Sequence, residues 1–400
     1  MKILAIETSC DETAVSVVRA EPPAGEADGD FSNVEFTVLG NTLVSQIDIH
    51  REYGGVFPAV AKREHAKSLV PLTIKTLKEA GLHTERETDM HKDLEDVLLR
   101  EPDLLEQFKK HISKLEKPNI DMIAVTHGPG LEPALWVGIN FARALSLTWN
   151  VPVIPVNHME GHIFSALLGE KIENTYRLST TEFPALALLI SGGHTELVLI
   201  KSHLEYEIIG ETQDDAAGEA FDKVARMLSL PYPGGPELSR LSEIAREKSI
   251  ESPFKLPRPM KNSDNFDFSF SGLKTAVLYK LKKIGENSKN QKSYDTSYDD
   301  VSYENKLLVA REFEDAVADV LVHKTRKAIE KYNAKTLLVG GGVSANKYIR
   351  EKLGELDVKL LLPQQELTGD NAIMIAIAGY FRKLKNGEAS EIRAEGNLRL

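Results

Sequence analysis

The sequence predicts an α/β fold that is built twice along the chain, and two observations support this. Residues 2–20 and 185–202 each consist of two short β-rich apolar runs around small and polar turn residues, which is typical of a β-hairpin. Residues 120–145 and 334–353 each begin with an apolar run that enters a glycine turn and continues with helical periodicity. Each hairpin precedes one such strand–turn–helix unit, so the order of elements repeats.

This repeat predicts two similar lobes around a ligand-binding cleft. The hairpin and the later strand–turn–helix unit occur once in residues 1 to about 150 and again from about 183 to 355, as expected for a degenerate internal duplication. We therefore expect an N-terminal lobe over residues 1–150 and a C-terminal lobe over residues 151–400, whose final helix is free to pack back on the N-terminal lobe. Ligands of α/β proteins gather at the carboxyl ends of strands, where the glycine turns lie.

Composition favours a globular, cytoplasmic protein. Of the 400 residues, 42% are hydrophobic and 27% are charged, which is ordinary for two packed domains. The single cysteine, Cys10, excludes an intramolecular disulfide, the N-terminus does not resemble a secretory signal, and the apolar runs are too short to span a bilayer. A net charge of -11 argues against a surface that coats nucleic acid unaided, although a local basic patch or a partner can supply phosphate contacts.

Three segments fit the repeated pattern poorly. Residues 20–33 are rich in proline, glycine and acidic residues, and residues 285–304 are polar with few aliphatic side chains, so we expect loops. Residues 83–118 are highly charged, and Pro102 precedes apolar residues at helical spacing, which predicts a helical insertion. The residues at that spacing are Leu105, Phe108, Ile112 and Leu115.

Two histidines, His158 and His162, stand four residues apart at the start of a predicted helix. Positions i and i+4 share one helix face, so both imidazoles could reach one metal ion. An arbitrary HxxxH pair also occurs on ordinary wet helices, so the pattern alone leaves both interpretations open. Glu160 lies between the histidines on a different helix face, which disfavours a zincin-type peptidase.

Asp370 is a candidate third ligand, because it follows a Thr-Gly turn at the entry of an apolar helix. Asp is also a good N-cap residue, and taken alone that role explains the position at least as well. Two neutral imidazoles with one carboxylate would suit iron or zinc and would leave coordination positions for substrate oxygens.

Glycine-rich turns indicate where an anionic ligand could bind. Residues 189–197, "LISGGHTEL", place paired glycines in a hairpin turn, and residues 339–346, "VGGGVSAN", end a strand and open a helix without a following GK[ST]. Both patterns also arise for steric reasons alone. Asp222 precedes another glycine pair at 234–235 and could hold a ribose hydroxyl, with an exposed helix salt bridge as the alternative.

Asp11 and Glu12 lie in the first hairpin turn, and His194 lies in the matching turn of the second half. An acidic pair facing a cleft could steer a cation or an amine, but a turn rich in Ser, Asp and Thr is often only a turn. These three residues are candidates for general-base catalysis by position only.

A basic segment, residues 254–283, carries Phe266, Phe268 and Phe270 among its charges. Such interleaving suits contacts with RNA phosphates and bases. A strand with alternating core aromatics followed by an amphipathic helix explains the pattern equally well.

Taken together, these motifs resemble one family, the universal tRNA threonylcarbamoyladenosine transferases, which comprise the bacterial TsaD and the archaeal-eukaryotic Kae proteins and were once described as O-sialoglycoprotein endopeptidases. The resemblance extends in order over nearly the whole chain. The matching strings are "IETSCDET", "GGVFPAVAKREH", "THGPGLEPALWVGINFARAL", "VNHMEGH", "LISGGHTEL", "DDAAGEAFDKVARML", "YPGGPEL", "FSFSGLKTAV", "GGGVSAN" and "TGDNAIMIA".

The resemblance implies a duplicated actin-like, sugar-kinase-like (ASKHA) fold with one metal ion, iron first and zinc or magnesium as alternatives. It implies transfer of the threonylcarbamoyl group from threonylcarbamoyl-adenylate to N6 of the adenosine adjacent to the anticodon in tRNAs that read ANN codons, with release of AMP. Carried over by position, the metal ligands would be His158, His162 and Asp370. The contacts to the adenylate would be Leu189, Ile190, Ser191, Gly192, Gly193, Asp222, Gly235 and Asn346.

The string "NHMEGH" is similar to the bacterial and mitochondrial branch of that family, and Leu189 stands where the other branch has tyrosine. The resemblance therefore implies a TsaB-like paralogue and a TsaE-like ATPase as partners, with a TsaC- or Sua-like enzyme supplying the adenylate. The insertion at 83–118 departs from the usual bacterial pattern. A lineage-specific partner contact there is a hypothesis.

Three other functions compete with this one. An ATP-dependent kinase of the same fold would use the glycine turns but has no need of the histidine pair. A metallopeptidase is disfavoured by the position of Glu160. A catalytically idle scaffold would not require His158, His162 and Asp370 together.

Overall fold

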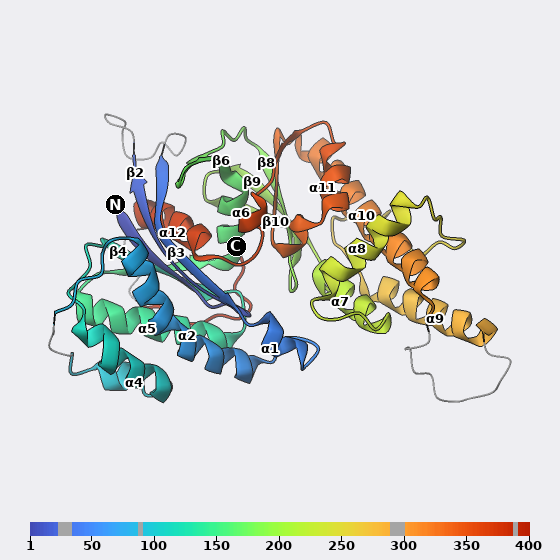
Figure 1. The fold of residues 1–400 in the computed structure, drawn as a ribbon. Helices are drawn as coiled ribbons and strands as arrows, with labels where there is room; N and C mark the ends of the chain where they lie inside the picture. Colours follow the sequence, from blue (N-terminus) through green and yellow to red (C-terminus); the bar gives the residue numbers. More distant parts are fainter. Residues whose placement is uncertain (23–33, 87–90, 289–300, 387–390) are drawn as a thin grey trace. The chain divides into compact units, whose positions relative to one another are not determined.

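The computed structural model describes residues 1–22, 34–86, 91–288, 301–386 and 391–400 (Figure 1). The predicted loops at 20–33 and 285–304 fall largely outside these residues. None of the helices in the described ranges is both long and apolar enough to cross a membrane.

The chain forms two compact units. The first contains Met1–Thr180 and Gly369–Leu400, and the second contains Thr181–Thr368. The boundary expected near residue 150 differs from this division, because the strands that follow residue 150 hydrogen-bond into the first sheet and are therefore part of its unit.

The first unit contains a seven-stranded sheet in the order β5-β4-β1-β2-β3-β7-β6. Antiparallel pairing joins β1, β2 and β3, with Ile3 opposite Val18, and parallel pairing joins β1, β4 and β5. The strands are β1 (Lys2–Glu7), β2 (Glu12–Glu21), β3 (Glu35–Ser45), β4 (Met122–Gly128), β5 (Val153–Asn157), β6 (Leu168–Ile172) and β7 (Thr175–Leu178).

The second unit repeats this arrangement. Its five-stranded sheet has the order β12-β11-β8-β9-β10, with antiparallel β8, β9 and β10 and parallel β8, β11 and β12. The strands are β8 (Ala185–Ile190), β9 (Thr195–Ser202), β10 (Glu205–Glu211), β11 (Thr336–Gly340) and β12 (Lys359–Leu361). The order and the directions of these five strands match those of β5-β4-β1-β2-β3 in the first sheet. The predicted duplicated, actin-like α/β fold is confirmed.

Helices cover both faces of the first sheet. One face contributes Leu4, Ile6, Val15 and Val17 to a core shared with α2 and α5, while α12, red in Figure 1, packs against the same strands from the other side. Gly379 permits this approach, since a Cβ there would lie 2.7 Å from that of Ala124. The helices are α1 (Ile47–Arg51), α2 (Pro58–Glu79), α3 (Leu94–Val97), α4 (Pro102–His111), α5 (Glu132–Trp149), α6 (His158–Leu167) and α12 (Ala372–Asn386).

The predicted helical insertion is present and belongs to the first unit. Helix α4 begins at Pro102, as expected, and passes into a short 3₁₀ turn, η1 (Ile112–Lys114). Phe108, Ile112 and Leu115 are buried, whereas Leu104 replaces Leu105 as the buried residue of the first turn. The insertion thus contributes to the core of the unit instead of projecting from it.

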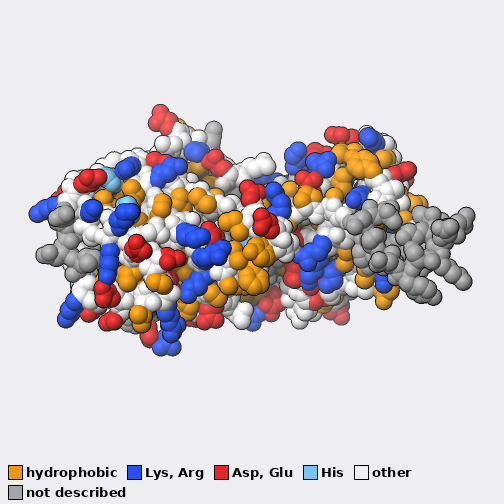
Figure 2. Space-filling view, turned by 60° about the horizontal axis from the view of Figure 1, so that its bottom comes forward, with side chains coloured by type: hydrophobic (Ala, Val, Ile, Leu, Met, Phe, Trp, Pro, Cys, Tyr) orange, Lys and Arg blue, Asp and Glu red, His pale blue; other side chains and the backbone are white. Residues whose placement is uncertain are grey.

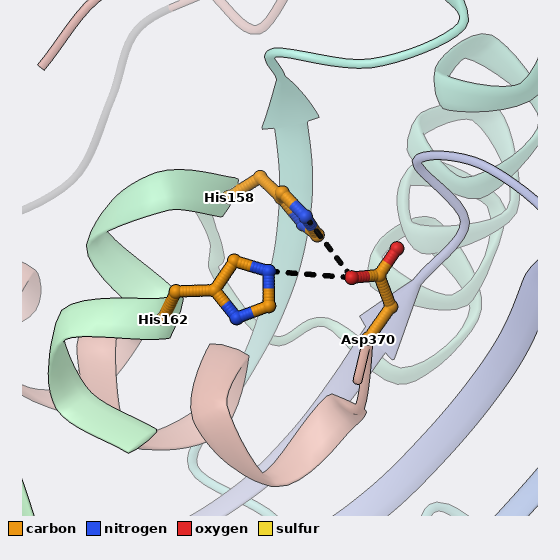
Figure 3. A group of neighbouring side chains, drawn as sticks. All are labelled: His158, His162 and Asp370. Atoms are coloured by element: carbon orange, nitrogen blue, oxygen red, sulfur yellow. Dashed lines mark ion pairs between the residues drawn. The ribbon is translucent and has the colours of Figure 1, made fainter. Parts of the chain in front are cut away.

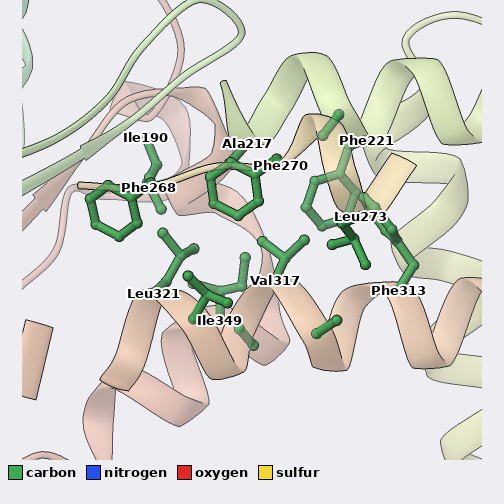
Figure 4. Packing of buried hydrophobic residues seen from close by; sticks show 14 of the residues in the cluster. Ile190, Ala217, Phe221, Phe268, Phe270, Leu273, Phe313, Val317, Leu321 and Ile349 are labelled. Carbon is green, nitrogen blue, oxygen red and sulfur yellow. The ribbon is translucent and has the colours of Figure 1, made fainter. Parts of the chain in front are cut away.

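The second unit has its own core, centred on phenylalanine side chains (Figure 4). Phe268 and Phe270 are fully buried and pack towards α10, and Phe266 is also buried. The alternative that these rings stack on RNA bases is therefore wrong, because no ring face is available to a base. The helices are α7 (Ala217–Met227), α8 (Gly234–Glu247), α9 (Ser271–Ser288), α10 (Tyr303–Tyr332), η3 (Gly342–Ala345), α11 (Lys347–Gly354) and η4 (Gln365–Leu367).

Candidate functional site

Helix α6 starts immediately after β5, and this junction positions the histidine pair. The side chain of Asn157 accepts hydrogen bonds from the backbone N–H groups of Met159 at 2.8 Å and Glu160 at 3.3 Å, which is an N-cap. His158 therefore occupies the first helical turn, and His162 follows one turn later on the same face (Figure 3). Both side chains are buried.

Asp370 reaches the same point from the segment that precedes α12. Its Oδ1 lies 3.2 Å from Nε2 of His158 and 3.3 Å from Nε2 of His162 (Figure 3). Asp370 is not the N-cap of α12, because it is Asn371 whose Oδ1 accepts the N–H of Met374, at 2.9 Å. Asn371 performs the capping, and Asp370 faces the histidines instead.

Glu7, at the end of β1, supports the histidine pair and was not among the site residues predicted from the sequence. Its Oε2 lies 3.1 Å from Nδ1 of His158, and it also accepts a hydrogen bond from Oγ1 of Thr126. Its Oε1 accepts the N–H of Ser9. Since an ionised carboxylate can only accept, Nδ1–H of His158 donates to Glu7, and Nε2 is the ring atom that faces Asp370 and can bind a metal ion once it has lost its proton. The sequence signal that could have identified Glu7 is an acidic residue at the end of an otherwise apolar strand.

Charges in this cluster are strongly coupled. Burial opposes protonation of His158, but the carboxylates of Asp370 and Glu7 outweigh it and raise its pKa well above the ordinary value. Burial also disfavours the charged form of Asp370, yet the neighbouring histidines hold its pKa well below the usual range. Burial lowers the pKa of His162, so that imidazole is neutral at pH 7.

The cluster fits a divalent metal ion. One ligand atom from each of His158, His162 and Asp370 lies within 4.8 Å of the others. Two atoms bound at about 2.1 Å to one tetrahedral ion are roughly 3.4 Å apart, close to the two N–O separations above. Both ring nitrogens of His162 are buried without a hydrogen bond among the described residues, and Nε2 has the ion-pair contact with Asp370 at 3.3 Å. A cation would bind the lone pair of Nε2.

Asp11 and Glu12 lie in the turn beside this cluster. Ser9, in the same turn, donates from its hydroxyl to Oδ2 of Asp370 at 3.4 Å. Burial, reinforced by the charges of Asp11 and Asp370, raises the pKa of Glu12 to about 10, and Ser45 donates to its Oε1. Glu12 therefore holds a proton at neutral pH. His194 belongs to the second unit.

The second unit contains a pocket of about 630 Å³ that includes several of the predicted ligand contacts. Gly192, Asp222, Gly235 and Asn346 all line it. Leu189 and Ile190 are fully buried in β8 and do not belong to its lining. Ser191 and Gly193 complete the turn, where the Ser191 hydroxyl accepts the N–H of His194 at 3.1 Å.

Asp222 and Asn346 have structural roles in the walls of this pocket. Asp222 Oδ1 accepts the N–H groups of Gly234 at 2.7 Å and Gly235 at 3.3 Å, so it caps α8. The amide nitrogen of Asn346 donates to Ser239 at 2.8 Å and Glu314 at 2.7 Å, and its oxygen accepts from Ile349. Both N–H bonds of the Asn346 side chain are thus already used. These hydrogen bonds fix the position of the Asn346 side chain in the pocket wall.

Comparison with known proteins then decides the family. The family model for tRNA N6-adenosine threonylcarbamoyltransferase, TsaD, matches residues 37–89 and 103–377. The chain belongs to this family. It is 40% identical to the tRNA N6-adenosine threonylcarbamoyltransferase of Persephonella marina over all of this chain and 95% of that protein, and 39% identical to that of Thermosipho africanus over all of both chains.

A solved structure also overlays on the chain. It is (R)-2-hydroxyglutaryl-CoA dehydratase component A of Acidaminococcus fermentans, at 12% identity and a TM-score of 0.45, covering 96% of this chain and 100% of that one.

As a member of the TsaD family, the chain is an acyltransferase that modifies tRNA, and the resemblance seen in the sequence is confirmed. The kinase alternative is not favoured. The family is metal-dependent, and the cluster of His158, His162 and Asp370 offers a place for the ion.

Proposed function

We propose that the chain transfers the threonylcarbamoyl group of threonylcarbamoyl-adenylate to N6 of the adenosine adjacent to the anticodon in tRNAs that read ANN codons, releasing AMP. The observation that carries this proposal is the convergence of His158, His162 and Asp370, residues far apart in the sequence, in a member of the TsaD family.

The proposed cofactor is one divalent ion held by His158, His162 and Asp370. Two imidazoles with one carboxylate suit iron, with zinc as the next choice and magnesium after it. When bound, such an ion supplies Lewis acidity towards the carbonyl or phosphoryl oxygens of the donor. Glu7 would fix the imidazole of His158 for this purpose, because it accepts the Nδ1 proton.

The chain's own groups would contribute chiefly binding and orientation. A mixed anhydride already has a good leaving group, so holding the amine and the acyl carbon in line gives most of the acceleration. The backbone N–H groups of Gly192 and Gly193 are suited to the phosphate or the developing oxyanion, whereas the N–H of Ser191 already donates to the carbonyl of His194 at 2.9 Å. Asp11 is a better candidate than Glu12 for receiving the amine proton, because Glu12 keeps its own proton at neutral pH.

The proposed setting is a cytoplasmic assembly with partners. The full-length similarity to bacterial members of the family supports a TsaB-like paralogue and a TsaE-like ATPase, with a TsaC- or Sua-like enzyme supplying the donor. Charge also favours help from a partner. The chain carries a net charge of -11, and on the face drawn in Figure 2 basic side chains are interspersed with acidic ones.

The test is reconstitution. The purified chain is mixed with its partners, threonine, bicarbonate, ATP and tRNA, and tRNA nucleosides are measured by mass spectrometry. His158→Ala and Asp370→Ala should abolish threonylcarbamoyladenosine, while replacement of the exposed His111 by Ala should not. Full activity of both site variants would refute the proposed role of the cluster. Stoichiometric phosphorylation of a small metabolite without tRNA modification would favour the kinase.

A further inference from the structure

We propose that the aromatic ring of Tyr348 is the platform on which the purine base of the nucleotide stacks, with the guanidinium of Arg246 as a fixed support behind it. This inference rests on the proposed function, because it requires that the pocket of the second unit takes the adenylate. Both residues line that pocket, and neither is among the ligand contacts predicted from the sequence.

The support behind the ring is rigid. Cζ of Arg246 lies 3.4 Å from the centroid of the Tyr348 ring, which is a stacking distance. The guanidinium donates to Glu314 and, at 2.5 Å, to Asp315. The side chain of Glu314 is only 1% exposed and also accepts a hydrogen bond from Asn346, so its carboxylate is held in one position. Arg246 is therefore held against one face of the ring.

The ring is positioned by its backbone. Tyr348 lies in the first turn of α11, where Asn346 caps the helix and the next residue, Ile349, is fully buried. The carboxylate of Asp315, which also holds Arg246, lies near the phenol. A side chain fixed at its backbone and at one face loses little further freedom when a ligand binds to the other face.

A second cation lies further from the ring. Nζ of Lys352 lies 5.7 Å from the ring centroid, near the outer limit of a cation–π contact, and forms an ion pair with Glu355 at 2.6 Å. A stacked base lies at roughly 3.5 Å, closer to the ring than this ammonium group. Glu355, the C-cap residue of α11, gives Lys352 a partner other than the ring.

The lining of the pocket matches the two ends of a nucleotide. Gly192 and Gly342 expose backbone that suits a phosphate, and Glu243 and Glu247 supply acceptors for an exocyclic amine. Phe221 also lines the pocket, but it is 2% exposed and packs in the core. Tyr348 is the half-buried aromatic ring in the lining. Stacking on such a ring is tolerant of base identity but stronger for a purine.

The experiment measures binding of AMP and CMP to the full chain by isothermal titration calorimetry. Tyr348→Leu should weaken AMP binding by about 10-fold or more, with a smaller loss for CMP, while Tyr348→Phe retains wild-type affinity for both. In the reconstituted reaction Tyr348→Leu should raise KM for the adenylate with little change in kcat. Thermal denaturation checks that each variant is folded.

A blocking variant separates this inference from the proposed function. Gly342 lines the pocket, and a Cβ there meets nothing within 4 Å, so Gly342→Phe fills the pocket without a clash at its base. If Gly342→Phe abolishes AMP binding while Tyr348→Leu leaves it unchanged, the stacking role is wrong and the pocket assignment stands. If the wild type does not bind AMP, or neither variant changes its binding, both ideas are refuted.

Discussion

Nδ1 of His158 lies 3.1 Å from Oε2 of Glu7, a carboxylate with no exposed surface at the end of the first strand. This contact fixes the orientation of the imidazole and links the candidate metal cluster to the centre of the first sheet. Ser9 and Thr126 also donate to this carboxylate, so three groups, with His158, depend on Glu7 as their acceptor. The relationship therefore bears on both metal affinity and folding.

The first prediction concerns Glu7 itself. Glu7→Gln keeps the shape but weakens the acceptor for Nδ1 of His158, so metal affinity should fall about 10–100-fold. Affinity is measured by competition with a chelator of known strength, and metal content by elemental analysis. Glu21→Gln, at the exposed end of the neighbouring strand, is the matched control and should bind metal normally. Equal affinities for the two variants would contradict the supporting role of Glu7.

The second prediction concerns protons released when metal binds. Burial opposes protonation of His158, but the carboxylates of Asp370 and Glu7 outweigh this effect. The pKa of His158 in the metal-free protein is therefore raised. Metal must then displace close to one proton per ion at pH 7, and binding should weaken as pH falls. Calorimetric titration in buffers of different ionisation enthalpy counts the protons. A binding enthalpy that does not depend on the buffer would argue against a protonated His158.

The third prediction concerns stability against acid. Burial lowers the pKa of His65 to about 4, and its side chain is fully buried between Thr13 and the carbonyl of Cys10. The unfolded chain takes up a proton near pH 6.5, whereas the folded chain does so only near pH 4. Stability is therefore lost as pH falls through this window, by about 3 kcal/mol in total.

Urea denaturation of chelator-treated protein at pH 7.5 and pH 4.5 tests this directly. His65→Gln removes the titrating group, so its stability should change less between the two pH values than that of the wild type. Other groups titrate equally in both proteins, and the difference isolates His65. Identical losses in the two proteins would show that His65 is protonated alike in the folded and unfolded states.

The fourth prediction concerns the ion pair that joins α6 to α12. Nε of Arg382 donates to Oε2 of the fully buried Glu160 at 2.6 Å. Arg382→Met leaves a buried carboxylate without this cation and should cost about 3–5 kcal/mol. The double replacement Glu160→Gln with Arg382→Met should recover part of that loss, as measured by the denaturation midpoint. A double variant no more stable than Arg382→Met alone would mean that the pair is not what holds these helices.

Sequence periodicity was sufficient for the doubled sheet and for the start of α4, because strands and helices bury residues at fixed intervals. Helical spacing paired His158 with His162 and left Asp370 as a separate candidate, and only the family resemblance united the three. Spacing could not decide between ligand and helix cap for Asp370, since the answer depends on the neighbouring Asn371 accepting the hydrogen bond.

Other features depend on tertiary contacts that no local pattern encodes. Glu7 comes to the site only when β1, β4 and α6 meet. The hydrogen bonds from the Asn346 amide to Ser239 and Glu314 likewise join segments far apart in the sequence, and its contact with the adenylate stays a prediction. The phenylalanines of residues 266–270 were ambiguous for the same reason. Alternating aromatics describe a surface platform and a core strand equally well, and burial alone separates them.

The polypeptide departs from the first unit at Thr180 and rejoins it at Gly369, and Asp370 is the next residue. The other two proposed ligands, on α6, also belong to the first unit and precede Thr180. An ion bound by all three would therefore join two parts of the first unit that the whole second unit separates along the chain. Because only the folded arrangement brings the three together, a bound ion would stabilise the first unit against unfolding.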